Sequence, residues 1–344
     1  MVTTEDVLPL AIYYEQPHWF KPLFAELDRR GAAYVKLSAV EHTYGPEDRP
    51  EEMYALVLNK MSPSAWNRGH GDQIFYTMGF LEHLHARGVR VINGARAFRS
   101  ELSKAAQLVM LEGLGLGYPR ARVIHRAEQA VGAAEGLRWP VVVKPNIGGS
   151  GAGVKRFDRV EDLAEAARTP GGLMLGMDTT GLVQEFVPAR GAYIVRVEVL
   201  DGNYLYAIKI HITGETFDLC PADICRTPMG VELDRAACAV DAVKSGLTVE
   251  RFDPGPEVIA EVERMMEAAG IELGGVEYMV DDRDGRRVYY DTNALSNFVA
   301  DGEKVVGIDP FARLADWLAR VALEANAARR VRSTVGGGLG VGAR

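Results

Sequence analysis

The stretch that decides the fold is 141-VVVKPNIGGSGAGV-154, which directly follows Pro140. Its valines predict a buried strand that ends at Lys144, and a loop rich in glycine comes next. Glycines let backbone N–H groups approach a ligand closely, and a neighbouring lysine adds a full positive charge. The stretch therefore predicts an anion-binding loop whose natural ligand is a polyphosphate. The alternative is a solvated hairpin in which Lys144 only ends a strand.

Two familiar phosphate-binding loops do not match this stretch. A GxxxxGK[ST] loop needs a lysine after its second glycine, but Val154 follows Gly153 here. A GxGxxG fingerprint also fails, because Gly149, Gly151 and Gly153 are spaced by two. The loop therefore needs support from the rest of the chain.

The composition restricts the class of protein. The 344 residues predict two or three domains, and 47% hydrophobic with 25% charged residues is ordinary for a globular chain. The net charge of −8 argues against nucleic acid or an anionic membrane as a partner. The N-terminus lacks the features of a secretion signal, and the chain lacks an apolar run of the ~18–20 residues that a membrane span needs. Cys220, Cys225 and Cys238 lack the spacing of a zinc site and read as reduced thiols, so we expect a cytoplasmic protein.

The order of predicted elements indicates an α/β fold that is α+β in part. Strand-like and helical runs alternate up to Asn93, which predicts an open parallel sheet. A helix over 100–115 follows, with Ser100 and Ser103 as alternative caps. From Leu182 the pattern changes to antiparallel strands, with hairpin turns at Asp201-Gly202 and 281-DDRDG-285. The predicted division is 1–95, 96–181 and 182–328, followed by a disordered tail over 329–344.

Oxygen-bearing side chains gather at two places downstream of the glycine loop. The run 183-VQEFVP-188 is apolar except for Gln184 and Glu185, and a strand there can offer backbone groups and a carboxylate to a purine edge. Asp291 and Asn293 lie two apart on a predicted strand, so they share one face, and the hairpin brings Glu277 alongside. Two carboxylates and an amide are oxygen ligands suited to Mg²⁺.

The set of motifs in this order resembles the ATP-grasp superfamily over roughly Leu8 to Ala325. The similarity is closest to the branch of the ribosomal-protein glutamate ligase (RimK-type) and glutathione synthetase-like enzymes. It rests on 103-SKAAQLVMLEGLGLGYPRARV-123, the glycine loop, 182-LVQEFV-187, 193-YIVRVEVLDG-202, 275-GVEYMV-280 and 289-YYDTNALSNF-298. The resemblance implies three domains: an N-terminal open parallel sheet, a small central lid and a C-terminal antiparallel sheet with helices.

The resemblance also implies roles for particular residues. Arg196 and Lys209 would be catalytic, Arg196 by stabilising charge on the transferring group. Glu277, Asp291 and Asn293 would hold Mg²⁺, with Mn²⁺ as a second candidate. The predicted ATP contacts are Lys104, Lys144, Gly148, Gly149, Ser150, Gly151, Gly153, Gln184, Glu185, Phe186 and Val187.

The metal motif departs from the usual pattern of the family. The last motif is commonly E-x-N, but here it is Asp291-Thr292-Asn293, and Glu277 stands where Asp is common. Metal binding should survive, because Glu277 is longer than the usual aspartate by about as much as Asp291 is shorter than the usual glutamate. An aspartate at this position also resembles the inositol-phosphate kinase branch.

The main functional hypothesis is an ATP- and Mg²⁺-dependent carboxylate–amine ligase that acts through an acyl phosphate. Its substrates would be an amino acid or small carboxylic acid and an amine, and the resemblance suggests a homodimer. The alternatives are a kinase that phosphorylates a small-molecule hydroxyl and a non-enzymatic nucleotide-binding regulator. The candidate substrate contacts, each of which has an ordinary solvated side chain as its alternative, are Lys60, Arg68, His70 and Arg226.

Overall fold

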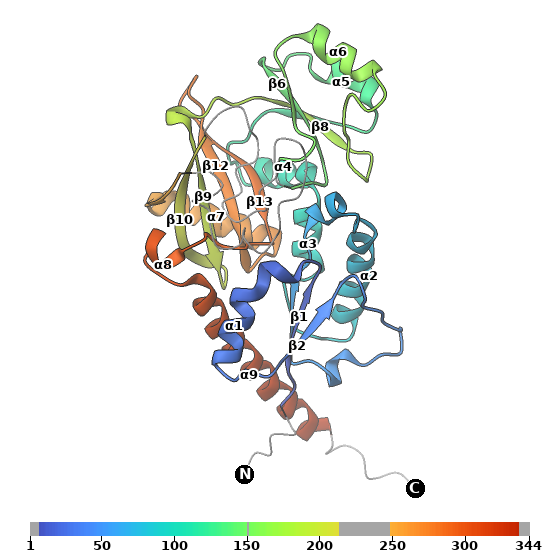
Figure 1. The fold of residues 1–344 in the computed structure, drawn as a ribbon, viewed down its shortest axis with the longest axis vertical. Coiled ribbons are helices and arrows are strands. Elements are labelled where there is room, and N and C mark those ends of the chain that lie inside the picture. The colour runs from blue at the N-terminus through green and yellow to red at the C-terminus, as the bar shows by residue number, and fades with distance from the viewer. Residues whose placement is uncertain (1–6, 150, 213–247, 337–344) are drawn as a thin grey trace.

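The computed structural model describes residues 7–149, 151–212 and 248–336, which contain three sheets and the helices that cover them (Figure 1). The candidate substrate residue Arg226, the loop residue Ser150 and all three cysteines lie outside these ranges. Within them, no helix combines the length and the apolar character that crossing a bilayer requires.

The first sheet is parallel, as the alternating pattern predicted, and its strands lie in the order β2-β1-β3-β4. Strands β1 and β3 are buried along their whole length, which explains their nearly continuous hydrophobic sequence. Helix α1 packs on one face and α2 on the other. The elements are β1 (Leu10–Tyr14), α1 (Lys21–Arg29), β2 (Tyr34–Ser38), β3 (Leu56–Lys60), α2 (Asp72–Ala86) and β4 (Val91–Ile92).

Two short helices, rather than one, connect the first sheet to the second. Helix α3 (Ala95–Leu102) ends before Ser103, whose backbone is extended at φ −128° and ψ 100°. Helix α4 (Lys104–Gly113) then begins, and the Ser103 hydroxyl accepts a hydrogen bond from the backbone N–H of Ala106. Of the two alternative caps, Ser103 therefore begins the helix that carries Lys104.

The second sheet is antiparallel, with strands in the order β5-β8-β6-β7. Helices α5 and α6 pack against it around a separate hydrophobic cluster. Strand β8 belongs to this sheet, so the predicted domain division between residues 181 and 182 falls after the first residue of that strand. The elements are β5 (Ala121–Ile124), α5 (Ala130–Ala133), β6 (Val141–Pro145), β7 (Lys155–Phe157), α6 (Val160–Arg168) and β8 (Gly181–Glu185).

The third sheet is also antiparallel, as predicted, in the order β11-β10-β9-β12-β13. Helix α7 covers one face of it, and on the other face Ile194, Tyr206 and Ile208 join the hydrophobic cluster shared with the first sheet. The short strands β7 and β11 were not predicted from the sequence. The elements are β9 (Tyr193–Leu200), β10 (Asn203–His211), β11 (Val249–Phe252), α7 (Gly255–Ala269), β12 (Leu273–Val280), β13 (Arg287–Asn293) and α8 (Gly302–Val305).

The last helix, α9 (Pro310–Gly336), returns to the first sheet and packs beside α1 (Figure 1). The Asn326 side chain binds the backbone of Leu8 through both its amide groups, at 2.9 and 3.1 Å. The prediction of disorder from position 329 is wrong up to Gly336. The run after Asn326 is rich in alanine and arginine, which are good helix formers, so the helix continues.

Candidate active site

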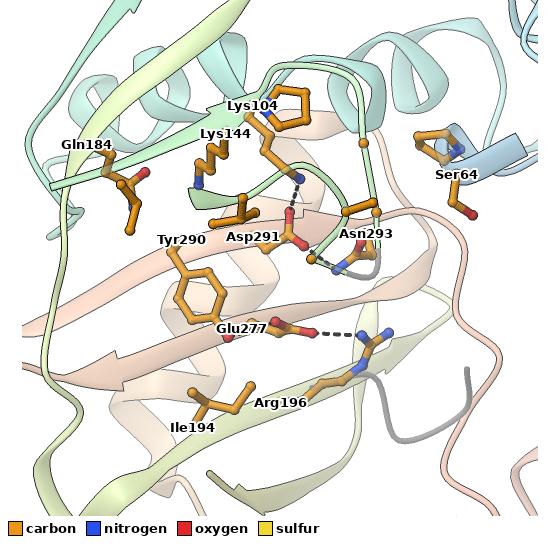
Figure 2. A pocket seen from close by; sticks show the side chains of 18 of the residues that line it. Ser64, Lys104, Lys144, Gln184, Ile194, Arg196, Glu277, Tyr290, Asp291 and Asn293 are labelled. Atoms are coloured by element: carbon orange, nitrogen blue, oxygen red, sulfur yellow. Dashed lines mark hydrogen bonds and ion pairs between the residues drawn. The ribbon is translucent and has the colours of Figure 1, made fainter. Parts of the chain in front are cut away.

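A cavity of about 620 Å³ lies where the three sheets meet. Its walls come from the carboxyl edge of the first sheet, the strands β6 and β8 of the second, and the exposed face of β9, β12 and β13 (Figure 2). A cavity of this size accommodates a nucleotide or a similar small molecule.

Two lysines enter the cavity from the second sheet and from the helix that precedes it. Lys104 stands at the start of α4, and Lys144 near the end of β6 (Figure 2). Lys144 is buried, and burial, followed by the nearby charge of Lys104, lowers its pKa to about 8. Two ammonium groups so close together favour a polyanion between or beside them.

The facing carboxylates lie on the β12–β13 hairpin. Glu277 and Asp291 are direct register partners, and Asn293 follows on the same face of β13. Asp291 Oδ1 accepts a hydrogen bond from Lys104 Nζ at 2.8 Å, and Asp291 Oδ2 one from Asn293 Nδ2 at 3.3 Å. Burial alone would raise the pKa of Asp291, but Lys104 and Lys144 outweigh it and keep that pKa low. The aspartate is thus held as an anion.

Glu277 is enclosed by two donors. Its Oε1 accepts from Arg196 Nη1 at 2.9 Å, and its Oε2 from the Tyr290 hydroxyl at 2.8 Å (Figure 2). Burial raises the pKa of Glu277, although Arg196 opposes the shift. Tyr290 was not predicted as a site residue.

The donor set of this hairpin fits a hard divalent cation. Glu277, Asp291 and Asn293 present carboxylate and amide oxygens on one wall of the cavity. No group of three His, Cys, Asp or Glu side chains capable of holding a metal occurs among the described residues. Because Glu277, Asp291 and Asn293 supply oxygen donors but too few to surround an ion, they suit a metal such as Mg²⁺ that takes its remaining ligands from water or phosphate oxygens.

The glycine loop closes another side of the cavity. Gly148, Gly149 and Gly151 line it, whereas Gly153 stands just behind with φ +77°. A Cβ at Gly149 would lie 3.1 Å from Ser64 Cβ, so the loop approaches the first sheet more closely than a larger residue allows.

The end of β8 and the residues after it form a further wall, which contains Gln184, Glu185, Phe186 and Val187. Gln184 Oε1 is buried and has no hydrogen-bond partner within the described part of the chain. The Glu185 carboxylate, which was predicted to face a purine edge, is already bound within the protein. Arg138 donates to it from its backbone N–H at 2.9 Å and from Nε at 3.3 Å.

The two predicted catalytic residues lie on opposite faces of the third sheet. Arg196 faces the cavity and donates from Nε to Glu198 Oε1 at 2.6 Å. Lys209 pairs in register with Val195, so its side chain points to the other face. There its ammonium group lies 4.6 Å from the Tyr193 ring and 4.7 Å from the Phe252 ring. The structure thus contradicts the placement of Lys209 in the site.

Three predicted substrate contacts are used inside the protein instead. Arg68 and His70 both bind the buried Glu15, with Arg68 Nη2 at 2.7 Å and His70 Nδ1 at 2.5 Å from its carboxylate. Lys60 is buried and donates to the Ser296 carbonyl at 2.6 Å. Because each already has a partner and stands behind the cavity wall, we withdraw the prediction that they contact substrate.

The first sheet contributes other residues to the cavity: Trp19, Ser62 and Ser64. Arg68 lies over the Trp19 ring at 4.6 Å and holds it in place. Glu101 and Glu198 also line the cavity and were missed. The spacing of Arg196 and Glu198, two apart on a strand, was the available signal for Glu198.

Comparisons with known proteins find relatives that match parts of this chain. No family model matches the chain. It is 28% identical over 275 residues to the carbamoyl phosphate synthase large chain of Thermus thermophilus. This match covers 76% of this chain and 24% of that protein. It is 30% identical over 126 residues to D-alanine–D-alanine ligase of Geobacter sulfurreducens. This match covers 37% of this chain and 38% of that protein. The chain thus spans about a quarter to two fifths of the length of these relatives.

Solved structures match over nearly the full chain. The ATP-grasp ligase PsnB, in complex with its minimal precursor, Mg and ADP, superimposes with a TM-score of 0.61 at 17% identity and covers 94% of this chain and 99% of that one. A RimK domain ATP-grasp protein from Sphaerobacter thermophilus gives a TM-score of 0.59 at 19% identity and covers 90% and 99%. Sequence matches and fold point the same way: the chain is similar in sequence to these enzymes and has the fold of the ATP-grasp proteins.

Proposed function

We propose that this protein is an ATP- and Mg²⁺-dependent carboxylate–amine ligase that forms an amide bond and releases ADP and phosphate. The observation that carries the proposal is the union of Lys104, Lys144, the glycine loop and the Glu277–Asp291–Asn293 set in one cavity. D-alanine–D-alanine ligase and PsnB, to which the chain is similar, are ligases by name.

The nucleotide would lie between the second and third sheets. Lys104, Lys144 and the backbone of the glycine loop contact its phosphates, and the wall from Gln184 to Val187 contacts its base. The unpaired Gln184 Oε1 is an acceptor that suits the exocyclic amino group of adenine. Glu277, Asp291 and Asn293 hold Mg²⁺, which neutralises phosphate charge when it is bound.

The chemistry consists of positioning and charge stabilisation. A substrate carboxylate attacks the γ-phosphorus, and the γ-phosphoryl bond to ADP breaks, which yields an acyl phosphate. An uncharged amine then attacks the acyl carbon, the C–O bond to phosphate breaks, and phosphate leaves with the bonding electrons while the nitrogen loses a proton. Arg196, placed beside Glu277, stabilises the charge that develops on the reacting groups. The glycine loop excludes water, which would otherwise hydrolyse the acyl phosphate.

We place the chain near the RimK-type and glutathione synthetase-like branch, because the sequence motifs resemble that branch and a RimK domain structure has the same fold. The amine and acid would be small molecules or the end of a peptide. The cavity wall formed by Trp19, Ser62 and Ser64 is the natural place for these substrates, since it lies beyond the carboxyl ends of the first sheet.

Hydroxylamine trapping tests the proposal. The protein is incubated with ATP, Mg²⁺, hydroxylamine and a panel of amino acids and small carboxylic acids, and hydroxamate and ADP are measured. We expect hydroxamate to form in proportion to ADP with at least one acid. The Lys209→Met variant is the matched control, because Lys209 faces away from the cavity, and it should behave as the wild type.

Two outcomes would contradict the ligase. ADP release without hydroxamate, accompanied by a stable phosphoester on a hydroxyl compound, would establish the kinase instead. Nucleotide binding without consumption under every condition would favour a regulatory module.

A further inference from the structure

Two residues that line the cavity each have a buried oxygen atom without a hydrogen-bond partner among the described residues: Glu198 Oε2 and Asn297 Oδ1. Glu198 itself is only 1% exposed. A buried acceptor without a donor costs free energy, more so when it is charged. Such atoms in the wall of a cavity therefore indicate a ligand that supplies donors.

The fold holds both side chains in place. Glu198 Oε1 is fixed by Arg196 Nε, and the absence of a side chain at Gly275 leaves room for the pair, since a Cβ there would lie 2.9 Å from Arg196 and 3.1 Å from Glu198 Oε1. The segment that carries Asn297 is held on both sides. Lys60 donates to the Ser296 carbonyl at 2.6 Å, and the Tyr206 hydroxyl accepts from the backbone N–H of Val299 at 2.9 Å.

The strand register connects these two observations. Tyr206 on β10 is the direct partner of Glu198 on β9, so it stands beside Glu198 on the same face of the sheet. Because Tyr206 also binds Val299, the 296–299 segment lies over this part of the sheet. Asn297 is thereby brought to the part of the cavity that Glu198 lines.

The charges near these oxygens select the kind of ligand. Arg196 is shared between two carboxylates, Glu198 and Glu277, so this wall carries more negative than positive charge. Lys60, the other nearby cation, lies close to a third carboxylate, Glu101, which also lines the cavity, so the carboxylates still outnumber the cations. A carboxylate or phosphate would be repelled here, whereas an ammonium group brings three donors and a positive charge.

We propose that Glu198 and Asn297 form the subsite that binds the ammonium group of the amine substrate. The inference rests on the proposed ligase function and adds the residues that recognise one of the two substrates. Arg196 connects Glu198 to Glu277, so an ammonium group on Glu198 lies beside the guanidinium that stabilises the reacting carbonyl. The ammonium group must lose a proton before its nitrogen can attack, and the unpaired Glu198 Oε2 is the acceptor for that proton. The subsite thus places the freed amine next to the carbon that it attacks.

The test compares two nucleophiles in the Glu198→Gln variant. Hydroxylamine is uncharged near neutral pH and needs no ammonium subsite. The twenty amino acids, tested as amine substrates, carry an ammonium group. Each of them competes with hydroxylamine for the acyl phosphate. We expect Glu198→Gln to impair the use of amino acids as amines far more than it impairs hydroxamate formation. The amine concentration that halves the hydroxamate yield should rise by at least about tenfold, as expected for a lost charged hydrogen bond.

Further variants separate recognition from a structural role. Asn297→Leu, at a partly exposed position, should also raise the amine concentration needed for half-inhibition, and by a larger factor than it lowers the hydroxamate yield. Glu250→Gln is the charge-matched control, because Glu250 lies on β11 beside Lys209 and away from the cavity, and it should leave both nucleophiles unaffected.

Two results would overturn the inference while the ligase stands. One is an equal loss with both nucleophiles in Glu198→Gln, which would mean that Glu198 acts only by positioning Arg196. The other is that the wild type forms hydroxamate, but none of the twenty amino acids lowers the hydroxamate yield. A wild type that forms no hydroxamate with any acid would instead overturn the ligase proposal, and this inference with it.

Discussion

At the scale of single residues, Lys144 connects the geometry of the cavity to solution pH. Its pKa is lowered to about 8 by burial and by Lys104. Bound phosphate favours the ammonium form, so ATP should bind most tightly below pH 8 and progressively more weakly as pH rises above that value. Isothermal titration with ATP from pH 7 to 9.5 measures this, and above pH 8 binding should take up a proton.

The Lys144→Met variant should bind ATP at least about tenfold more weakly at pH 7, because it loses a charged hydrogen bond to phosphate. Its affinity should also vary less with pH over the same range. The matched control is Lys209→Met, which removes a lysine on the opposite face of the third sheet. An unchanged ATP affinity in Lys144→Met would place the phosphates elsewhere.

Asp291→Asn tests the metal set. The substitution keeps the shape of the side chain but removes the charge that Lys104 and a metal ion would share. The Mg²⁺ concentration needed for half-maximal ADP release should rise by at least about tenfold, and turnover should fall, while the circular dichroism spectrum stays that of the wild type. Asp282→Asn on the exposed hairpin is the control. A wild-type Mg²⁺ requirement in Asp291→Asn would remove this residue from the metal set.

Residues that depend on local spacing could be predicted from the sequence, and residues that depend on distant partners could not. The i, i+2 spacing of Asp291 and Asn293 and the hairpin that pairs Glu277 with Asp291 were readable because strand geometry fixes them. Arg68 and His70 were misplaced because nothing local shows that both bind Glu15, more than fifty positions earlier.

At the scale of elements, the cap of α4 decides where Lys104 is presented. Ser103 accepts from the Ala106 N–H, and its hydroxyl donates to Asn146 Oδ1 in the glycine loop at 3.2 Å. Ser103→Ala should lower the free energy of unfolding by about 1 kcal/mol. It should also weaken ATP binding, because helix and loop lose a common contact.

Ser100→Ala is the matched control for this prediction. Ser100 lies in the last turn of α3 and donates only to backbone carbonyls of Arg96 and Ala269. Its removal should change the free energy of unfolding by less than about 0.5 kcal/mol in urea denaturation. If Ser100→Ala proves as costly as Ser103→Ala, the cap is not what stabilises this junction.

Long elements with a clear period were predictable, and short ones were not. Strands β7 and β11 have three and four residues, too few for an alternating pattern to stand out. They are specified by pairing with β6 and β10, which is information that lies elsewhere in the chain.

At the scale of the whole molecule, Asn93 joins the first sheet to the third. From the end of β4, its Nδ2 donates to the carbonyls of Leu273 and Ala294, both at 2.6 Å, and its Oδ1 accepts from the N–H of Glu272 at 3.1 Å. Asn93 also has φ +55°, which asparagine tolerates better than most residues.

Asn93→Ala should therefore be strongly destabilising. It leaves unpaired the backbone groups of Glu272, Leu273 and Ala294, all in or next to strands of the third sheet, at about 1–3 kcal/mol for each buried group. We therefore expect a loss of roughly 3 kcal/mol or more in urea denaturation. The control is Asn203→Ala, whose side chain bonds only the nearby Asp201 carbonyl at an exposed turn. A loss below about 1 kcal/mol in Asn93→Ala would show that the sheets are held together by other contacts.

The position of α9 has a consequence for synthesis on the ribosome. Leu314, Trp317 and Leu318 complete the same hydrophobic cluster as Leu10 and Ile12, some three hundred residues earlier. The first strands emerge from the exit tunnel long before the helix that shields them is translated. The nascent chain must therefore carry a bare apolar surface through most of its elongation, which makes it a natural client for chaperones that bind emerging polypeptides.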